Sequence, residues 1–167
     1  ESSAASDVYK RQLLNKVIYV ACTVGFGVGF GLILAVFLAK KTRLNGLLQS
    51  VAFSPYIVSL ASIALLWMWL MNNDFGFLNA LLAVFGIPAI DWLGSPKFAL
   101  MSLIIINVWK SVGYNALILV SALQGIPPHL YEAARLDRAN TWRTFSRITF
   151  PMISPTVFFL ALSLIHI

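Results

Sequence analysis

The sequence predicts an all-α, polytopic membrane protein. Hydrophobic residues make up 59% of the chain and charged residues only 11%, whereas roughly a quarter of the residues in a soluble domain are charged. Several apolar stretches reach the length of about 20 residues that a helix needs to cross a hydrocarbon core. The net charge of +6 does not require a nucleic-acid partner, because basic residues also accumulate in cytoplasmic loops. An ordinary soluble domain is thereby excluded.

Both ends of the chain are expected to be foreign to the natural protein. Residues 7–12 read Asp-Val-Tyr-Lys-Arg-Gln, which the DNA sequence GAT GTG TAT AAG AGA CAG encodes. The reverse complement of that DNA encodes the Leu-Ser-Leu-Ile-His-Ile of residues 162–167. Such inverted ends resemble the mosaic end of transposase-based sequencing adapters. We therefore interpret residues 1–12 and 162–167 as adapter translation and expect residues 13–161 to be an internal fragment of a longer protein.

Three full spans and the start of a fourth are expected in residues 13–161. Their approximate bounds are 17–38, 50–71, 99–123 and 152–161. The second span carries Pro55 near its start, where the missing N–H costs little. The apolar segment 77–85 is too short to cross a bilayer, and we expect it to form an interfacial or re-entrant helix.

The first span carries two glycine pairs with GxxxG spacing. These pairs are Gly25/Gly29 and Gly27/Gly31. In a membrane this spacing lets two helix backbones approach closely, whereas the GxGxxG spacing of a phosphate-binding loop is not met. We therefore expect helix packing here. The single cysteine, Cys22, excludes an intrachain disulfide and is interpreted as a packing residue.

Three polar residues are expected to share one face of the third span. Asn107, Lys110 and Tyr114 recur at positions i, i+3 and i+7. Lys110 lies about midway along the span, and an ionisable residue at that depth usually faces a bundle interior or a watery path. We therefore interpret the three as candidate translocation-pathway residues. Two alternatives stay open: Lys110 pairs structurally with an acid from a helix that the fragment lacks, or the span is shifted and Lys110 lies near the interface.

The most polar stretch, residues 124–151, follows the third span. It carries four arginines and two acids between apolar segments. Residues 130–137 predict a short helix, with Pro128 suited to its first turn. Thr141 is expected to cap a second short helix over residues 142–147.

Charge counting predicts that this stretch is cytoplasmic. The connection after the first span carries three basic residues and the stretch after the third span carries four, whereas residues 72–98 carry one lysine. The positive-inside rule places the more basic loops in the cytoplasm. A charged, helical loop there is suited to a protein partner, and an amphipathic loop resting on lipid headgroups is the open alternative.

Seven residues of this stretch stand at the offsets of a known motif: Glu132, Ala133, Ala134, Asp137, Ala139, Ile148 and Pro151. They resemble the EAA motif of the permease subunits of bacterial ATP-binding-cassette importers. Residues 55–59, 76–79, 91–93 and 109–113 are similar to the carbohydrate and glycerol-3-phosphate branch of that family. The family usually has glycine where this chain has Arg138, and a left-handed turn is strained at a non-glycine residue. We expect the turn to move to Asn140, or the two short helices to join differently.

The resemblance implies an importer permease core whose EAA helices, with Arg138 between them, dock on a separate ATPase subunit. It also implies a second permease subunit, an extracytoplasmic solute-binding protein, a bacterial inner-membrane location, and a sugar or glycerol-phosphate-like solute. The chain itself is then not an enzyme, and no cofactor or metal is expected. The alternative from another class is an ATP-independent channel or secondary transporter with Lys110 in the pathway. A membrane-embedded enzyme is disfavoured because the sequence offers no metal-ligand cluster.

Overall fold

The computed structural model describes residues 2–166, with side chains from Val8 to Ile165. Glu1 and Ile167, which belong to the expected adapter-derived ends, lie outside the described residues. The elements in chain order are α1 (Ser2–Leu38), α2 (Arg43–Ile57), α3 (Leu60–Leu70), α4 (Phe77–Val84), α5 (Pro96–Gln124), α6 (Pro128–Leu136), α7 (Thr141–Thr144), the π-helical turn η1 (Phe145–Thr149) and α8 (Phe150–His166). The described part contains no strand, which confirms the all-α class.

Three stretches are long and apolar enough to cross a membrane. They are Val8–Leu38, Pro96–Gln124 and Thr141–Ile165, with mean hydropathies of 2.3, 1.6 and 1.9. The first and second contain the spans expected at residues 17–38 and 99–123. The third contains the span expected from residue 152, but its helix begins eleven residues earlier, at Thr141. The polytopic character predicted from composition is thus confirmed.

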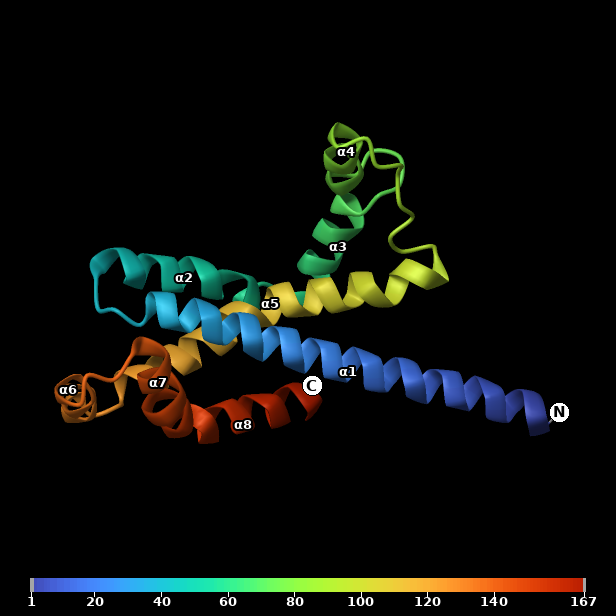
Figure 1. Cartoon of the computed structure of the whole chain (residues 1–167). Coiled ribbons are helices and arrows are strands. Elements are labelled where there is room, and N and C mark those ends of the chain that lie inside the picture. Colours follow the sequence, from blue (N-terminus) through green and yellow to red (C-terminus); the bar gives the residue numbers. More distant parts are fainter. Residues whose placement is uncertain (1, 167) are drawn as a thin grey trace.

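The core of the bundle is the seam between α1 and α5. The two helices run alongside each other, with α2 and α8 packed against them (Figure 1). Apolar side chains from α1, α5 and α8 fill the seam: Val28, Ala35, Leu38, Ala116, Leu119, Val120 and Leu160. On the other side of α5, a Cβ on Gly113 would overlap the carbonyl group of Ala52. Glycine at that position therefore allows the backbone of α2 to contact α5 directly.

One of the two predicted glycine pairs packs in this seam. A Cβ on Gly31 would lie 2.8 Å from the Cβ of Asn115, and a Cβ on Gly27 would lie 3.3 Å from the Ser111 hydroxyl oxygen. A Cβ on Gly25 or Gly29 would meet nothing within 4 Å. Close packing is thus confirmed for the pair Gly27/Gly31 alone.

The second span, expected over residues 50–71, is not one continuous helix. The structure divides this stretch into α2 and α3, which meet at an angle of 95°. Pro55 lies in the last turn of α2 rather than near a helix start, and the Ser54 hydroxyl donates to the Val51 carbonyl that the proline nitrogen leaves unpaired (2.8 Å). Ser59 then caps α3 by accepting a hydrogen bond from the Ser62 amide. Proline before the break and a capping serine after it end one helix and start another.

A second packing unit, the α3–α4 unit (residues 60–95), extends away from the bundle (Figure 1). Its core is formed by Ile63, Trp67, Met71 and Trp92. The segment expected as a short helix at residues 77–85 is confirmed as α4. Its placement at an interface or as a re-entrant helix stays a prediction.

Candidate functional site

The region that matches the EAA motif, called the coupling region (residues 125–149), lies at the end of the bundle where α1 and α5 both end (Figure 1). Its first helix, α6, has Pro128 in its first turn, as predicted. Two backbone hydrogen bonds close the other end of α6: the Arg138 amide donates to the Arg135 carbonyl (3.0 Å), and the Ala139 amide donates to the Ala134 carbonyl (2.9 Å). This pair of bonds is a Schellman motif, which requires a left-handed residue directly after the helix cap.

Arg138 occupies that left-handed position, with φ of 50°. The expectation that the turn would move to Asn140 is wrong, because Asn140 has φ of −65°. The Schellman bonds fix which residue takes the left-handed conformation, and they fall on Arg138 although it has a Cβ. Such a conformation costs a non-glycine residue about 1 kcal/mol.

The second short helix differs from its prediction in its start and its end. Asn140, not Thr141, caps it, because the Asn140 side-chain oxygen accepts from the Trp142 amide (3.1 Å). The helix also does not end at Arg147. It continues through the π-helical turn η1 into α8, and the Phe150 amide donates to the Phe145 carbonyl, five residues back. This wider turn stands immediately before Pro151, whose ring nitrogen has no proton to donate.

A groove of 390 Å³ lies between α6 and the helix that follows it, here called the docking groove. Its lining residues are Leu130, Ala133, Ala134, Asp137, Ala139, Arg143, Thr144, Arg147 and Ile148. Five of the residues predicted from the motif therefore meet around one depression. The alanine side chains keep it open, because any longer side chain at Ala133 or Ala134 would occupy the space.

Three of the predicted coupling residues lie outside the docking groove. Glu132 and Arg138 are exposed on α6 and its turn, and Pro151 is exposed in the first turn of α8. Conversely, Arg143 and Arg147 line the groove but were not predicted as site residues. Their spacing of i, i+4, which places two side chains on one helical face, is a signal that could have identified them.

Two polar contacts link the elements at this end of the bundle. The hydroxyl groups of Tyr131 and Thr149 are hydrogen-bonded at 3.1 Å, which joins α6 to η1. The Gln124 amide donates to the Ala39 carbonyl at the end of α1 (3.1 Å). Through α7, η1 and α8 the coupling region is also continuous with the third apolar stretch.

The three polar residues predicted on one face of α5 contact two different helices. The Asn107 side-chain amide donates to the Tyr19 hydroxyl of α1 at 2.7 Å. Lys110 and Tyr114 instead approach α2, where the Lys110 amino group lies 5.9 Å from the centroid of the Tyr56 ring. The structure thus brings Lys110 and Tyr114 together, and it places Asn107 in a different contact.

Lys110 and Tyr114 belong to an aromatic cluster that sequence reasoning did not identify as a site. The rings of Tyr56 and Tyr114 stack with centroids 4.3 Å apart and an interplanar angle of 11°. Phe53 lies next to both rings, at 5.7 and 6.5 Å. Tyr56 was noted only within the similarity at residues 55–59, because the pairing of α2 with α5 depends on the bend after Pro55.

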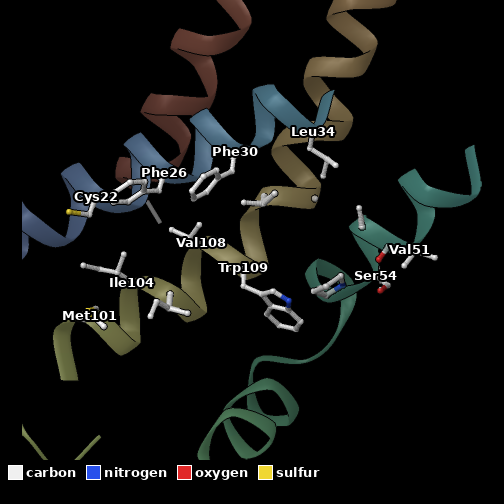
Figure 2. Close-up of a pocket in the computed structure, with 15 residues that line it drawn as sticks. Cys22, Phe26, Phe30, Leu34, Val51, Ser54, Met101, Ile104, Val108 and Trp109 are labelled. Carbon is white, nitrogen blue, oxygen red and sulfur yellow. Dashed lines mark hydrogen bonds between the residues drawn. The ribbon is translucent and has the colours of Figure 1, made fainter. Parts of the chain in front are cut away.

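A larger cavity lies elsewhere, between α1, α2 and α5. It measures about 970 Å³, and its walls are mostly apolar. Figure 2 shows Phe26 and Phe30 of α1 on one side of it and Val108 and Trp109 of α5 on another. Asn107, Lys110 and Tyr114 do not line it. The cavity and the predicted pathway residues are thus separate features of the bundle.

Comparison with known proteins assigns the chain to one family. Residues 27–166 match the model of the family described as "binding-protein-dependent transport system inner membrane component". Over 148 residues the chain is 38% identical to the probable ABC transporter permease protein YurN of Bacillus subtilis, covering 86% of this chain and 51% of that protein. Over 152 residues it is 34% identical to the sn-glycerol-3-phosphate transport system permease protein UgpA of Pectobacterium atrosepticum, covering 91% and 51%.

The fold agrees with a solved structure as well. A bacterial alginate ABC transporter, in complex with an alginate pentasaccharide-bound periplasmic protein, is similar with a TM-score of 0.77 at 26% identity. The match covers 86% of this chain and 50% of the chain in that structure. The chain therefore spans about half the length of the relatives it matches.

Proposed function

The chain belongs to the family of binding-protein-dependent transport system inner membrane components, and on that premise we propose that it is part of the membrane-spanning subunit of an ATP-driven importer. The observation that carries this proposal is the coupling region. It combines a groove walled by alanines with a helix that runs without interruption into an apolar stretch. The chain would bind no ATP itself, and hydrolysis would take place in a separate subunit.

In this proposal the ATPase subunit docks on the coupling region from the cytoplasm. The docking groove, with Ala133, Ala134, Asp137, Ala139 and Ile148 in its walls, would receive an element of that subunit. Glu132 lies exposed beside it, where its carboxylate can accept hydrogen bonds from an arginine or from backbone amides. Arg138 shapes the turn, and Pro151 lies where the docked helix enters α8. A second permease subunit and an extracytoplasmic solute-binding protein complete the proposed complex in a bacterial inner membrane.

The proposed solute is a sugar or a glycerol-phosphate-like compound. Lys110 supplies a positive charge, and the stacked rings of Tyr56 and Tyr114 supply flat apolar faces of the kind on which sugar rings pack. Asn107 adds an amide on the same helix. These residues support a pathway that accepts hydroxylated or anionic solutes.

Docking is tested with the intact permease co-expressed with the ATPase of its own importer. Glu132→Lys is expected to weaken co-purification of the ATPase about a hundredfold, because a charge that accepts hydrogen bonds at an interface is replaced by its opposite. Asp74→Lys makes the same change of charge in the connection between α3 and α4 and serves as the matched control. Undiminished co-purification of the Glu132→Lys variant would contradict the docking proposal.

The pathway is tested by uptake into proteoliposomes that contain the complete importer. Lys110→Met is expected to reduce uptake about tenfold, because a hydrogen bond to a charged group contributes about 1.5–3 kcal/mol. Unchanged uptake would show that Lys110 has no role in the translocation pathway. Uptake that proceeds without ATPase and ATP would instead support the channel or secondary transporter.

A further inference from the structure

A second pocket, distinct from the docking groove, lies between the coupling region and the ends of the membrane helices. This pocket, here called the junction pocket, measures about 420 Å³. Val36 and Ala39 at the end of α1 and Leu123 at the end of α5 form one wall, and residues of α6, α7 and η1 form the other. It therefore lies where two apolar stretches end, which is the level at which acyl chains give way to headgroups.

The two pockets share Ala139 and Thr144 but differ in charge. The docking groove is lined by Asp137, Arg143 and Arg147, an acid and two bases. The junction pocket is lined by Arg135 without an acidic residue among its described walls. A site with an unopposed guanidinium favours an anion, and the planar fork of arginine suits a phosphate.

The surroundings of the junction pocket add positive charge. Ala39 in its wall is followed directly by Lys40 and Lys41, and Arg43 begins the next helix. All three basic side chains are exposed. Basic pockets between membrane helices at the cytoplasmic side are suited to acidic lipid headgroups.

The remaining walls fit the other parts of a phospholipid. Thr141 lines the pocket, and its hydroxyl group can donate a hydrogen bond to a phosphate oxygen. Val36, Leu123 and Phe145 provide apolar surface for the glycerol backbone and the first acyl carbons. The lining of the pocket thus offers polar groups for a headgroup and apolar surface for its attached chains.

We infer that the junction pocket binds the phosphodiester headgroup of an anionic phospholipid, with Arg135 as the phosphate ligand. The shared chemistry is that of a phosphate anion, and the membrane lipid is the source, because the pocket adjoins the ends of α1 and α5. Its assignment to the cytoplasmic leaflet rests on the proposed function. A lipid bound there contacts α1, α5 and the coupling region at once, so it would hold the coupling helices against the membrane core.

Native mass spectrometry of the intact permease in complex with its ATPase tests this inference. The complex is exchanged into phosphatidylcholine, and dioleoyl phosphatidylglycerol is then added. The unmodified complex is expected to retain phosphatidylglycerol, and Arg135→Gln to weaken its retention about tenfold. Arg143→Gln, the same substitution in the docking groove, is the matched control and should change retention less than twofold. Arg135→Lys keeps the positive charge but loses the planar donor geometry of the guanidinium group. Its lipid retention should lie between those of Arg135→Gln and Arg143→Gln.

Several results would overturn the inference. Equal loss of lipid from Arg143→Gln and Arg135→Gln would indicate a diffuse basic surface. Displacement of the lipid by millimolar inorganic phosphate would indicate a site for a soluble anion. If Arg135→Gln disrupts the complex, Val36→Trp, which fills the apolar half without changing charge, should lose the lipid, and its full retention would refute the site. Loss of ATPase co-purification with lipid retained would place Arg135 in the docking interface, which refutes the lipid site but leaves the proposed function intact.

Discussion

The α3–α4 unit and the coupling region are both built from short helices outside the long apolar stretches, yet their polar groups are satisfied in opposite ways. In the α3–α4 unit the buried side chain of Asn79 accepts from the Ile90 amide and from the Trp92 ring nitrogen, and it donates to the Ile90 carbonyl, at 2.9–3.1 Å. In the coupling region Glu132 and Arg138 are exposed. The Asn79 side chain finds its hydrogen-bond partners within its own segment, whereas Glu132 and Arg138 present their charges to the surroundings.

This difference is in keeping with the proposal that the coupling region docks on a partner. A buried polar network whose members satisfy one another makes a segment rigid without outside help. The Trp92 carbonyl also accepts from the Ser102 hydroxyl of α5 (2.8 Å), which anchors the α3–α4 unit to the bundle. The coupling region has the Tyr131–Thr149 bond, a strained turn and an open groove. These features favour the coupling region, rather than the α3–α4 unit, as the proposed docking segment.

Removing the centre of the Asn79 network has the largest expected effect. Asn79→Ala should lower the free energy of unfolding of the α3–α4 unit by about 3 kcal/mol, because the Ile90 amide and the Trp92 ring nitrogen lose a buried acceptor. Limited proteolysis and hydrogen exchange over residues 72–95 measure the effect. Asn73→Ala changes an exposed neighbour and is the control. If both variants exchange alike, the unit is not held by this network.

A matched glycine pair tests the difference in packing between the two regions. A Cβ on Gly76 would overlap the backbone of Asn72 and lie 2.7 Å from the Leu70 carbonyl oxygen, so Gly76→Ala should cost about 2 kcal/mol. A Cβ on Gly125, at the start of the coupling region, would lie at an ordinary 3.4 Å from the Ala122 carbonyl oxygen. Gly125→Ala should change stability by less than about 0.5 kcal/mol. Thermal unfolding of both variants measures the difference, and equal shifts would refute it.

The smallest effect, with opposite sign, is expected at the strained turn. Arg138→Gly should stabilise the coupling region by about 1 kcal/mol, because glycine adopts positive φ without steric cost. Slower hydrogen exchange of the Ala139 amide, which donates to the Ala134 carbonyl, would report it. Asn140→Gly, at a cap with ordinary φ, should instead destabilise by a few tenths of a kcal/mol. A destabilised Arg138→Gly variant would mean that the arginine side chain makes compensating contacts.

The prediction of continuous helices holds where apolar length alone decides the structure. It does not hold over residues 50–71, where two local signals oppose a continuous helix. Residues 17–38 and 99–123 lie in uninterrupted helices, and neither range contains a proline. Residues 50–71 are equally apolar, but Pro55 removes a backbone donor and Ser59 offers a new cap. Sequence reasoning treated Pro55 as the start of a helix, since the same residue is favourable in a first turn and disruptive in a last one.

In the coupling region, too, local sequence signals predicted one part of the structure correctly and another part wrongly. The offsets of its motif residues predicted a two-helix element, and five of the predicted residues meet in the docking groove. Asn140 was chosen for the left-handed turn because asparagine tolerates it, yet the turn lies at Arg138. Intrinsic preference differs by about 1 kcal/mol between such residues, and the two Schellman bonds that fix the turn outweigh it.

By itself, the sequence determined the membrane-spanning class, the positions of the polar loop and of two long helices, and the family, because hydropathy and motif spacing are local properties of the chain. Tertiary structure alone decided which glycine pair packs, that Tyr56 joins Lys110 and Tyr114, and that a second pocket with Arg135 in its wall separates the coupling region from the membrane helices. Each of these depends on which face of one helix meets another. For Tyr56 that choice depends on the close contact of α2 with α5 at Gly113, and for the glycine pair it depends on the contact of Gly27 and Gly31 with Ser111 and Asn115. These contacts join residues far apart in the chain, and no local pattern encodes them.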